Sequence, residues 1–222
     1  MTPAPRLAIL ISGLGRNLQA ILEGVAAKKI PATLAAVVSN KADAAGLEHA
    51  RRAGVPAVVL PHEGYADREA FDRALAAALE QHGAELIAMA GFMRILTDGF
   101  IARFRGRMLN VHPSLLPRYR GLHTHRQVLA NRDAEHGSSV HFVTEKLDGG
   151  PVVIQGSFKV KPDDNEKSLQ ERVVREVETK IFPQAIAWLA RGELALAGDH
   201  AQLRGRVLSV PLALTDLEPA FR

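Results

Sequence analysis

Patterns of buried strands and of helices alternate through the first half of this chain. Residues 6–12 form a continuous apolar run of strand length, which is typical of a parallel strand covered on both faces. A glycine turn follows, and then apolar residues recur at helical spacing from Leu18 to Val25. Repetition of this unit predicts an α/β fold, a Rossmann-like and mostly parallel twisted sheet with helices on both faces.

The remaining elements follow from the same periodicities. Further strands are expected at 33–39, 57–60, 85–90 and 108–112, with helices at 44–53, 67–82 and 97–104. Asp67 is the expected N-cap of the second of these helices. Beyond residue 112 the pattern changes, and we expect a helix at 124–131 and strands at 138–144 and 152–160, which can pair antiparallel across a turn at 148–150.

The C-terminal part is therefore expected to add an antiparallel extension and a long helix to the sheet. Apolar spacing predicts this helix from Leu169, with a bend at Pro183 and a continuation towards Trp188. The last thirty or so residues are weakly patterned, and only a short strand at 206–210 is expected. Without repeats or a linker, we expect one domain over 1–222, with a nucleotide- or phosphate-binding half at 1–105 and a catalytic half at 106–222.

Composition excludes several classes of function. The 222 residues include no cysteine, which rules out disulfides, thiolate catalysis and thiolate metal sites. No run of about 18 apolar residues occurs, and Met1–Arg6 lacks a signal-peptide pattern, so a cytoplasmic enzyme without membrane contact is expected. The net charge of +4 comes from scattered arginines, and aromatic residues make up 5%. This favours a small anionic substrate over a nucleic acid.

The most informative stretch is Asn-Val-His-Pro-Ser-Leu-Leu-Pro at 110–117. Side chains alternate along a strand, so Asn110 and His112 point to one side while Val111 points into the sheet. Pro113 cannot donate to a ladder and should end the strand after His112. An amide and an imidazole then lie at the carboxyl end of a strand, where open α/β sheets bind ligands. Taken alone, the stretch is more typical of a polar strand end capped by a proline-rich turn than of a catalytic site.

A second candidate site is the glycine loop Ser-Gly-Leu-Gly-Arg-Asn at 12–17, between a strand and a helix. Glycines allow close approach of the backbone, and the free amides at a helix start attract an anion. The loop lacks the third glycine of a dinucleotide fingerprint, and Ser39-Asn40 stands where that fingerprint needs an acidic residue. A single phosphate is therefore favoured over a dinucleotide, which disfavours a dehydrogenase; a plain glycine turn is the alternative.

Asp148, in Leu-Asp-Gly-Gly-Pro at 147–151, lies in a loop whose glycines allow tight folding against a substrate. Several histidines surround the candidate site in sequence, among them His123, His125 and His141. They lack the spacing of a metal motif and carboxylates nearby, so no metal is expected.

These motifs together resemble the folate-dependent formyltransferase family, over about residues 7–183. The resemblance rests on Ile-Ser-Gly-x-Gly-x-Asn-Leu-Gln at 11–19, Ser-Asn-Lys-Ala-Asp-Ala at 39–44, Ala-Gly-Phe-Met-Arg-Ile-Leu at 90–96, the stretch at 110–117, Gly-Leu-His-Thr-His at 121–125, His-Gly-Ser-Ser-Val-His-Phe-Val at 136–143 and the loop at 147–151. It is strongest with members that formylate glycinamide ribonucleotide in purine (IMP) biosynthesis.

The resemblance implies direct transfer of the formyl group of 10-formyltetrahydrofolate, the co-substrate, to the primary amine of the ribonucleotide. Asn110 is then expected to hydrogen-bond the formyl oxygen, and protonated His112 to stabilise the oxyanion of the tetrahedral intermediate. Asp148 is expected to keep His112 protonated and to help remove the proton of the attacking amine. Donors aimed at such a charge can each contribute about 3–4 kcal/mol.

The resemblance also implies the residues that bind the substrates. Gly15, Arg16 and Asn17 are expected to bind the phosphate, and Glu178 the ribose hydroxyls. The folate-binding residues expected are Arg68, Met93, Arg94, Ile95, Leu96 and Asn110, with residues 93–96 and the loop before Asp148 lining the pterin pocket and Arg68 and Arg94 facing the glutamate tail. His141 is expected beside the site.

Three other functions share parts of this pattern. A formyltetrahydrofolate deformylase would give the formyl group to water, but is expected to have an N-terminal regulatory domain. A methionyl-tRNA formyltransferase is expected to have a C-terminal tRNA-binding domain. A catalytically silent nucleotide-binding module would bind without turnover. For the formyltransferase, the expected partners are small-molecule substrates, with the protein a monomer or homodimer.

Overall fold

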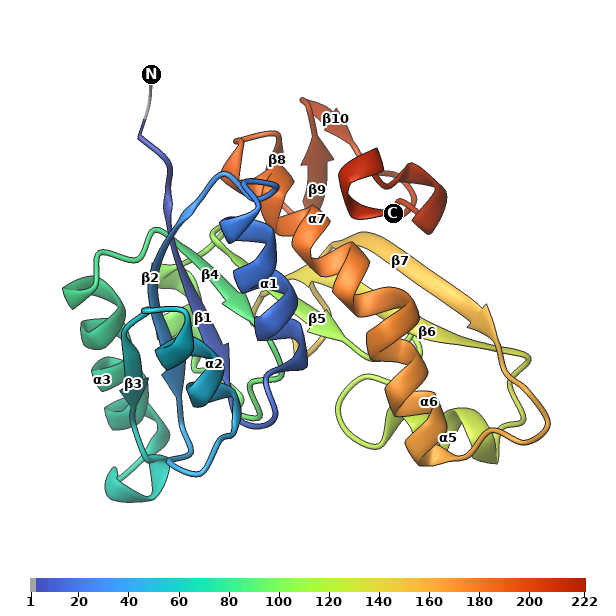
Figure 1. Ribbon diagram of the computed structural model, residues 1–222, viewed down its shortest axis with the longest axis horizontal. Coiled ribbons are helices and arrows are strands. Elements are labelled where there is room, and N and C mark those ends of the chain that lie inside the picture. The colour runs from blue at the N-terminus through green and yellow to red at the C-terminus, as the bar shows by residue number, and fades with distance from the viewer. Residues whose placement is uncertain (1–2) are drawn as a thin grey trace.

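A seven-stranded sheet in the order β3-β2-β1-β4-β5-β6-β7 forms the centre of the computed structural model, which describes residues 3–222 (Figure 1). The signal-peptide expectation for residues 1–6 therefore falls partly outside the described residues. Neighbouring strands from β3 to β5 are parallel, whereas β6 and β7 are antiparallel to their neighbours. The strands are β1 (Arg6–Ile11), β2 (Thr33–Ser39), β3 (Ala57–Val59), β4 (Leu86–Met89), β5 (Met108–His112), β6 (Glu135–Phe142) and β7 (Val152–Lys159). The predicted parallel sheet and its antiparallel extension are confirmed.

Helices cover both faces of the sheet, which explains why β1 is apolar from Leu7 to Ile11. Leu7, Ile9 and Ile11 pack in a core with α1, α2 and α7, whereas Ala8 and Leu10 pack in a second core with α3 and α4. The helices are α1 (Arg16–Ala26), α2 (Gly46–Arg52), α3 (Arg68–Gln81), α4 (Asp98–Arg103), α5 (Thr124–Ala130), α6 (Glu166–Arg172) and α7 (Thr179–Ala190), with short turns η1 (His62–Gly64), η3 (Leu214–Asp216) and η4 (Pro219–Phe221). Asp67 caps α3 as expected, because its side chain accepts from the Ala70 N–H.

The long C-terminal helix differs from the expectation in one detail. It runs from α6 into α7 through a π-helical turn, η2 (Val173–Glu178), while Pro183 lies inside α7. The irregularity is thus one turn before the proline at which we expected a bend. Glu178 on this turn hydrogen-bonds to two other elements. Such tertiary constraints are not visible in the sequence of the helix itself.

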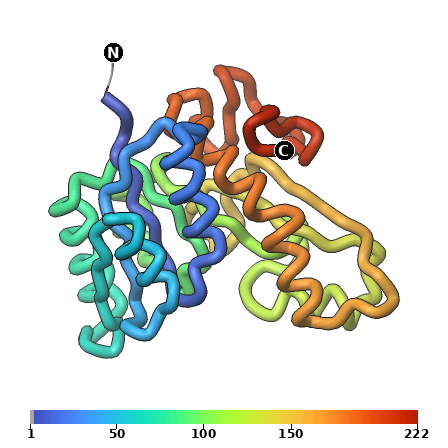
Figure 2. The backbone as a smooth tube through the Cα atoms, viewed as in Figure 1, coloured from blue at the N-terminus to red at the C-terminus, as the bar shows by residue number. Residues whose placement is uncertain are grey.

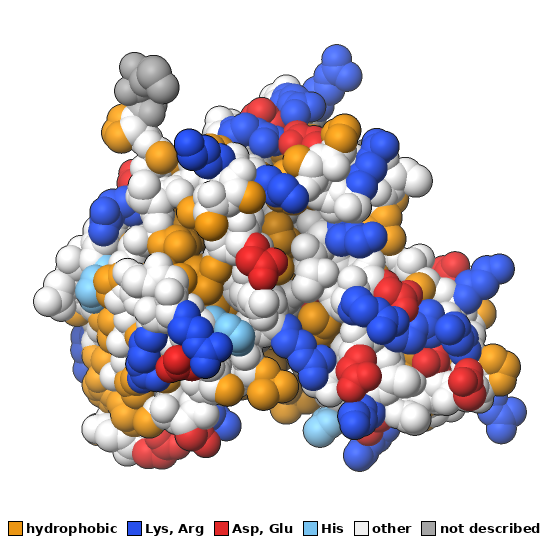
Figure 3. Space-filling view, viewed as in Figure 1, with side chains coloured by type: hydrophobic (Ala, Val, Ile, Leu, Met, Phe, Trp, Pro, Cys, Tyr) orange, Lys and Arg blue, Asp and Glu red, His pale blue; other side chains and the backbone are white. Residues whose placement is uncertain are grey.

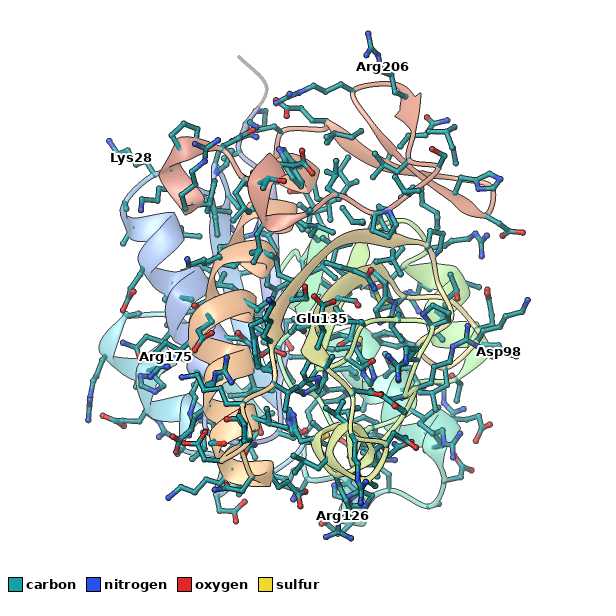
Figure 4. The ribbon with its side chains drawn as sticks, turned by 90° about the vertical axis from the view of Figure 1, so that its right-hand side faces the viewer. Lys28, Asp98, Arg126, Glu135, Arg175 and Arg206 are labelled. Carbon is teal, nitrogen blue, oxygen red and sulfur yellow. The ribbon has the colours of Figure 1, made fainter. Side chains whose placement is uncertain are left out.

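The C-terminal residues form a second sheet that the sequence pattern predicts only in part. β8 (Leu194–Ala197), β9 (His200–Leu203) and β10 (Arg206–Val207) pair antiparallel in the order β10-β9-β8. Only β10 was expected, so the prediction of a single strand in this region is wrong. The sheet lies at the end of α7 (Figures 1 and 2), and in Figure 4 Arg206 extends outward from its tip.

Charged side chains of both signs are interspersed on the face shown in Figure 3, where Lys and Arg form no continuous stripe. Within the part of the chain that the structure describes, no helix has the length and apolar character needed to cross a membrane.

Candidate active site

Asn110 and His112 lie at the carboxyl end of β5, which ends at His112 immediately before Pro113. Val111 between them is buried in the core. His112 is 5% exposed and Asn110 is half-buried. The expected alternation along the strand is therefore confirmed. It places an amide and an imidazole on the same side of the sheet.

The ring of His112 is held from both sides. Its Nε2 donates to the carbonyl oxygen of Tyr119 at 2.8 Å, and its Nδ1 lies 3.4 Å from Oδ2 of Asp148. Because Nε2 uses its hydrogen on Tyr119, Nδ1 can donate only when the imidazole is protonated. The state of His112 therefore decides whether this nitrogen acts as a donor or as an acceptor.

Asp148 reaches this position through a tightly folded loop. Its Oδ2 accepts from the Gly121 N–H at 2.8 Å, and its own φ of 45° is left-handed. A Cβ atom on Gly150 would lie only 1.9 Å from the carbonyl oxygen of Phe142, so this position requires glycine. Burial would raise the pKa of Asp148, but this pKa is lowered, because the carboxylate lies against His141 and His112 and accepts from the Gly121 N–H. Asp148 is therefore a carboxylate at neutral pH.

The pKa of His112 is lowered, and burial is the main cause. The hydrogen bond to Tyr119 and the charge of Asp148 raise it, and His141 lowers it further. Asp148 thus acts in the expected direction, but burial outweighs it. In the substrate-free protein the neutral imidazole is favoured, and protonation of His112 stays a prediction for the complex with substrates.

His141, on β6, is paired with Asn110 in the antiparallel register of β5 and β6. Its Nδ1 donates to the carbonyl oxygen of Phe142 at 2.8 Å, so its Nε2 accepts from Nδ2 of Asn110 at 3.1 Å. The same Nε2 lies 3.6 Å from Oδ1 of Asp148. His141 therefore fixes the orientation of the Asn110 amide and leaves one of its N–H hydrogens free for a ligand.

A cavity of about 90 Å³ opens beside these residues. Of the predicted folate-binding residues, Arg94, Ile95, Leu96 and Asn110 line it, together with Asp148 and the segment 143–147. The guanidinium of Arg94 stacks on Phe71. Met89 and Ile101 also line the cavity, and the sequence reading missed both because their apolar spacing predicts only core positions.

Met93 and Arg68 do not line this cavity. The side chain of Met93 is exposed, and its backbone N–H donates to the Ser12 hydroxyl at 2.8 Å. Arg68 is exposed at the start of α3. The sequence did not identify Ser12, whose hydroxyl also donates to Oδ1 of Asn40 and so connects the glycine loop to the loops after β2 and β4.

The glycine loop has the geometry of an anion site. Gly15 is left-handed with φ 75°, and α1 begins at Arg16. A Cβ atom on Gly15 would lie 2.6 Å from Cα of Gly46, so the loop requires glycine here. The first N–H groups of α1 lack intrahelical acceptors and are available to an anion. The side chain of Arg16 is exposed.

The side chain of Asn17 points away from a phosphate role. Its Nδ2 donates to Oε2 of Glu178 at 2.7 Å, and its Oδ1 is buried without a hydrogen-bond partner. A free carbonyl oxygen accepts hydrogen bonds and therefore suits a hydroxyl group rather than a phosphate oxygen. Glu178 is 4% exposed and contacts Ser138 on β6 as well. The structure thus brings Asn17 and Glu178 together, two residues that the resemblance assigns to different parts of the same substrate.

No group of three or more His, Asp or Glu side chains within residues 3–222 is arranged to hold a metal ion. Half-buried His125 and buried His136 do form a pair, with Nδ1 of His125 2.8 Å from Nε2 of His136.

Comparisons with known proteins agree with this architecture. The formyl transferase family model matches residues 5–186. A phosphoribosylglycinamide formyltransferase of Escherichia coli (strain K12) is 48% identical over 202 residues, which cover 91% of this chain and 95% of that protein. The trifunctional purine biosynthetic protein adenosine-3 of Homo sapiens is 42% identical over 198 residues, which cover 89% of this chain and 19% of that protein.

Solved structures show the same similarity. The phosphoribosylglycinamide formyltransferase of Coxiella burnetii superposes with a TM-score of 0.88 at 40% identity, covering 95% of this chain and 99% of that one. The glycinamide ribonucleotide transformylase 1 of Symbiobacterium toebii also superposes with a TM-score of 0.88, at 42% identity, covering 91% and 95% of the two chains. This chain belongs to the formyl transferase family.

Proposed function

We propose that this enzyme transfers the formyl group of 10-formyltetrahydrofolate to the primary amine of glycinamide ribonucleotide in purine biosynthesis. The observation that carries the proposal is the convergence of Asn110, His112 and Asp148 beside one cavity at the end of β5. The names of the similar proteins support the same reaction.

Asn110 and His112 stabilise the negative charge in this proposal. As the amine nitrogen bonds to the formyl carbon, the formyl oxygen becomes an oxyanion, and the free N–H of Asn110 donates to it. Protonated His112 donates from Nδ1. His112 is neutral in the substrate-free protein and takes up a proton in this step, because the oxyanion and Asp148 both place negative charge beside its ring and so favour the imidazolium. Collapse of the intermediate breaks the bond to the folate nitrogen, which takes up a proton as it leaves and so balances the proton removed from the amine.

Asp148 has two functions in the proposed reaction. Its carboxylate, 3.4 Å from Nδ1 of His112, stabilises the charged imidazole. It also helps to move the proton from the attacking amine, through water. The pKa of Asp148 is lowered, which supports both functions because the group is ionised at neutral pH.

In this proposal the ribonucleotide binds at the glycine loop and the folate binds in the cavity beside Asn110. Backbone N–H groups at Gly15, Arg16 and Asn17 bind the phosphate, and Arg16 adds a positive charge. Glu178 and the unpartnered oxygen of Asn17 bind the ribose hydroxyls. The folate pterin occupies the cavity lined by residues 94–96 and 143–148. Arg68, Met93 and Arg94 contact the outer part of the folate.

In this proposal residues 1–105 form the phosphate-binding half of a single domain and residues 106–222 form the catalytic and folate-binding half. The partners are the two small-molecule substrates, the protein is a monomer or homodimer, and it acts in the cytoplasm. Sedimentation analysis and cell fractionation test the last two points.

An assay with one substrate omitted tests the reaction. The purified protein is incubated with 10-formyltetrahydrofolate, with or without glycinamide ribonucleotide, and release of tetrahydrofolate is followed. We expect release only when both are present. Equal release without the ribonucleotide would identify a deformylase, and binding of both substrates without release would identify a silent module.

A further inference from the structure

The buried carboxyl group of Glu178 is held by two neutral side chains. Its Oε2 accepts from Nδ2 of Asn17 at 2.7 Å, and its Oε1 lies 2.9 Å from the Ser138 hydroxyl. Within residues 3–222, no ion pair involves Glu178. An isolated carboxylate is costly to bury, whereas a carboxylic acid is not.

Ser138 lies at the centre of this arrangement and is fully buried. Its Oγ is 2.6 Å from the carbonyl oxygen of His112 and 2.9 Å from Oε1 of Glu178. A hydroxyl group has one hydrogen, and a carbonyl oxygen has none. The single Ser138 hydrogen satisfies the shorter contact, to the His112 carbonyl, so a hydrogen on Glu178 best satisfies the second.

The surroundings of Glu178 favour the neutral acid. Burial, the largest effect, raises the pKa of Glu178, while the hydrogen bonds of Asn17 and Ser138 oppose it. The groups that face it are neutral: the Asn17 amide on α1, the Ser138 hydroxyl on β6 and, behind Ser138, the His112 backbone on β5. On its own turn, Glu176 forms ion pairs with Arg172 and Arg175.

We propose that Glu178 is a neutral carboxylic acid in the substrate-free protein and donates to Ser138, whose hydrogen in turn holds the carbonyl oxygen of His112. This series of hydrogen bonds connects Asn17, at the end of the glycine loop, to the backbone of His112. Glu178 and Ser138 are therefore positioning residues for His112. A neutral Glu178 also keeps negative charge away from the expected phosphate site; this last consequence rests on the proposed function, whereas the protonation state does not.

Infrared difference spectroscopy tests the protonation state directly. The spectrum of the wild-type protein at about pH 7 is compared with that of Glu178→Gln. We expect a carbonyl stretch of a protonated carboxylic acid that is present only in the wild type. A difference spectrum with carboxylate bands alone would overturn the proposal. Because no substrate is present, this result is independent of the reaction that the enzyme catalyses.

The pH dependence of stability gives a second measurement. An acid whose pKa is raised by folding contributes stability that is present below its unfolded pKa and is lost as the pH rises through the folded pKa. Glutamine mimics the neutral acid, because its N–H can replace the O–H towards Ser138. The melting temperature of Glu178→Gln minus that of the wild type should therefore increase as the pH rises from about 5 to about 8.

Glu176→Gln is the matched control on the same turn. The pKa of Glu176 is lowered, mainly by its hydrogen bonds with Arg172 and Arg175 against the opposing effect of burial, so its difference from the wild type should be constant over this pH range. Parallel curves for Glu178→Gln and the wild type would contradict a neutral Glu178. If Glu178→Gln does not fold, Ser138→Ala replaces it in the infrared experiment. Loss of the Ser138 hydroxyl, which accepts from Glu178, should shift the carbonyl stretch of the acid. An unshifted stretch would contradict the hydrogen bond from Glu178 to Ser138.

Ser138→Ala and Ser138→Thr test the positioning of His112. The alanine variant loses the hydrogen bond to the His112 carbonyl, so we expect kcat to fall about five- to tenfold with little change in KM. The ring resonances of His112 should move in the NMR spectrum of this variant. Threonine keeps the hydroxyl and should restore both. Equal losses in the two variants, or an unmoved His112 resonance in Ser138→Ala, would show that Ser138 only fills space.

Discussion

Replacement of Asp148 by asparagine isolates the effect of one negative charge on His112. The amide oxygen of asparagine can still accept from the Gly121 N–H, so the loop should keep its fold. The charge lies 3.4 Å from Nδ1 of His112, and both side chains are at most 10% exposed. At an effective dielectric constant of about 20, two unit charges at this distance interact by about 5 kcal/mol.

Asp148→Asn should cost the transition state about half of this interaction energy, because the asparagine dipole and rearranged water replace the other half. A loss of 2–3 kcal/mol corresponds to a fall in kcat of about a hundredfold. The KM values of both substrates should change by less than about fivefold, since the charge acts mainly on the transition state.

Steady-state kinetics over a range of pH, together with NMR titration of His112, measure this effect. A reaction that needs protonated His112 slows as the pH rises through the pKa of His112. Loss of Asp148 removes a cause that raises this pKa, so the fall in rate should move to lower pH. A change in kcat of less than about threefold, with an unchanged titration of His112, would refute the electrostatic role of Asp148. Loss of folding would instead identify Asp148 as a structural residue.

Three further changes test other parts of the site. Arg16→Ala should weaken ribonucleotide binding about three- to tenfold, because the backbone N–H groups persist; an unchanged Kd by calorimetry would make Arg16 a surface residue only. Gly150→Ala should lower the free energy of unfolding by at least about 1–3 kcal/mol in denaturant titrations, because its Cβ meets the Phe142 carbonyl. Gly64→Ala, with open space around it, should be nearly neutral. Similar losses of stability in the two variants would contradict the packing argument. Burial lowers the pKa of His136 to about 4, so the free energy of unfolding should fall by about 3 kcal/mol as the pH drops from about 6.5 to about 4. His136→Asn should lose much of this pH dependence. If the free energy of unfolding falls equally steeply with pH in the variant, His136 is not its source.

Sequence patterns predicted the elements whose surroundings are uniform. β2 was predicted with its observed ends, because a strand covered on both faces is apolar throughout. β5 was predicted to end at His112, because proline cannot continue the ladder. The strands β8 and β9 were missed because their small sheet is only half-buried and alternates weakly. The Gly-Asp pair at 198–199, in the turn between these strands, was the available signal for a hairpin.

The candidate site was predicted in its members but not in its electrostatics. Strand alternation placed Asn110 and His112 together, whereas Asp148 was assigned to the site by the resemblance to the formyltransferase family and not by its glycine loop alone. Their mutual geometry depends on the Tyr119 carbonyl and the Gly121 N–H, which hold His112 and Asp148. Backbone groups in a loop give no sequence signal. The extent of burial, which lowers the pKa of His112, is likewise a property of the packed structure.

Links between loops were also beyond reach of the sequence. The hydroxyl of Ser12 accepts from the Met93 N–H, and the N–H of Ser12 donates to the Gly91 carbonyl at 3.1 Å. These contacts join residues about eighty positions apart and arise because β1 and β4 are neighbours in the sheet. A serine after a strand has no pattern that identifies such a role.

The fate of the formyl carbon tests the central claim most directly. With 10-formyltetrahydrofolate labelled with ¹³C in the formyl group and glycinamide ribonucleotide, the label can be followed by NMR during turnover. The account predicts that the label appears as a formamide on the ribonucleotide amine, in a one-to-one ratio with the tetrahydrofolate formed. Release of the label as free formate, at the same rate with and without the ribonucleotide, would contradict it.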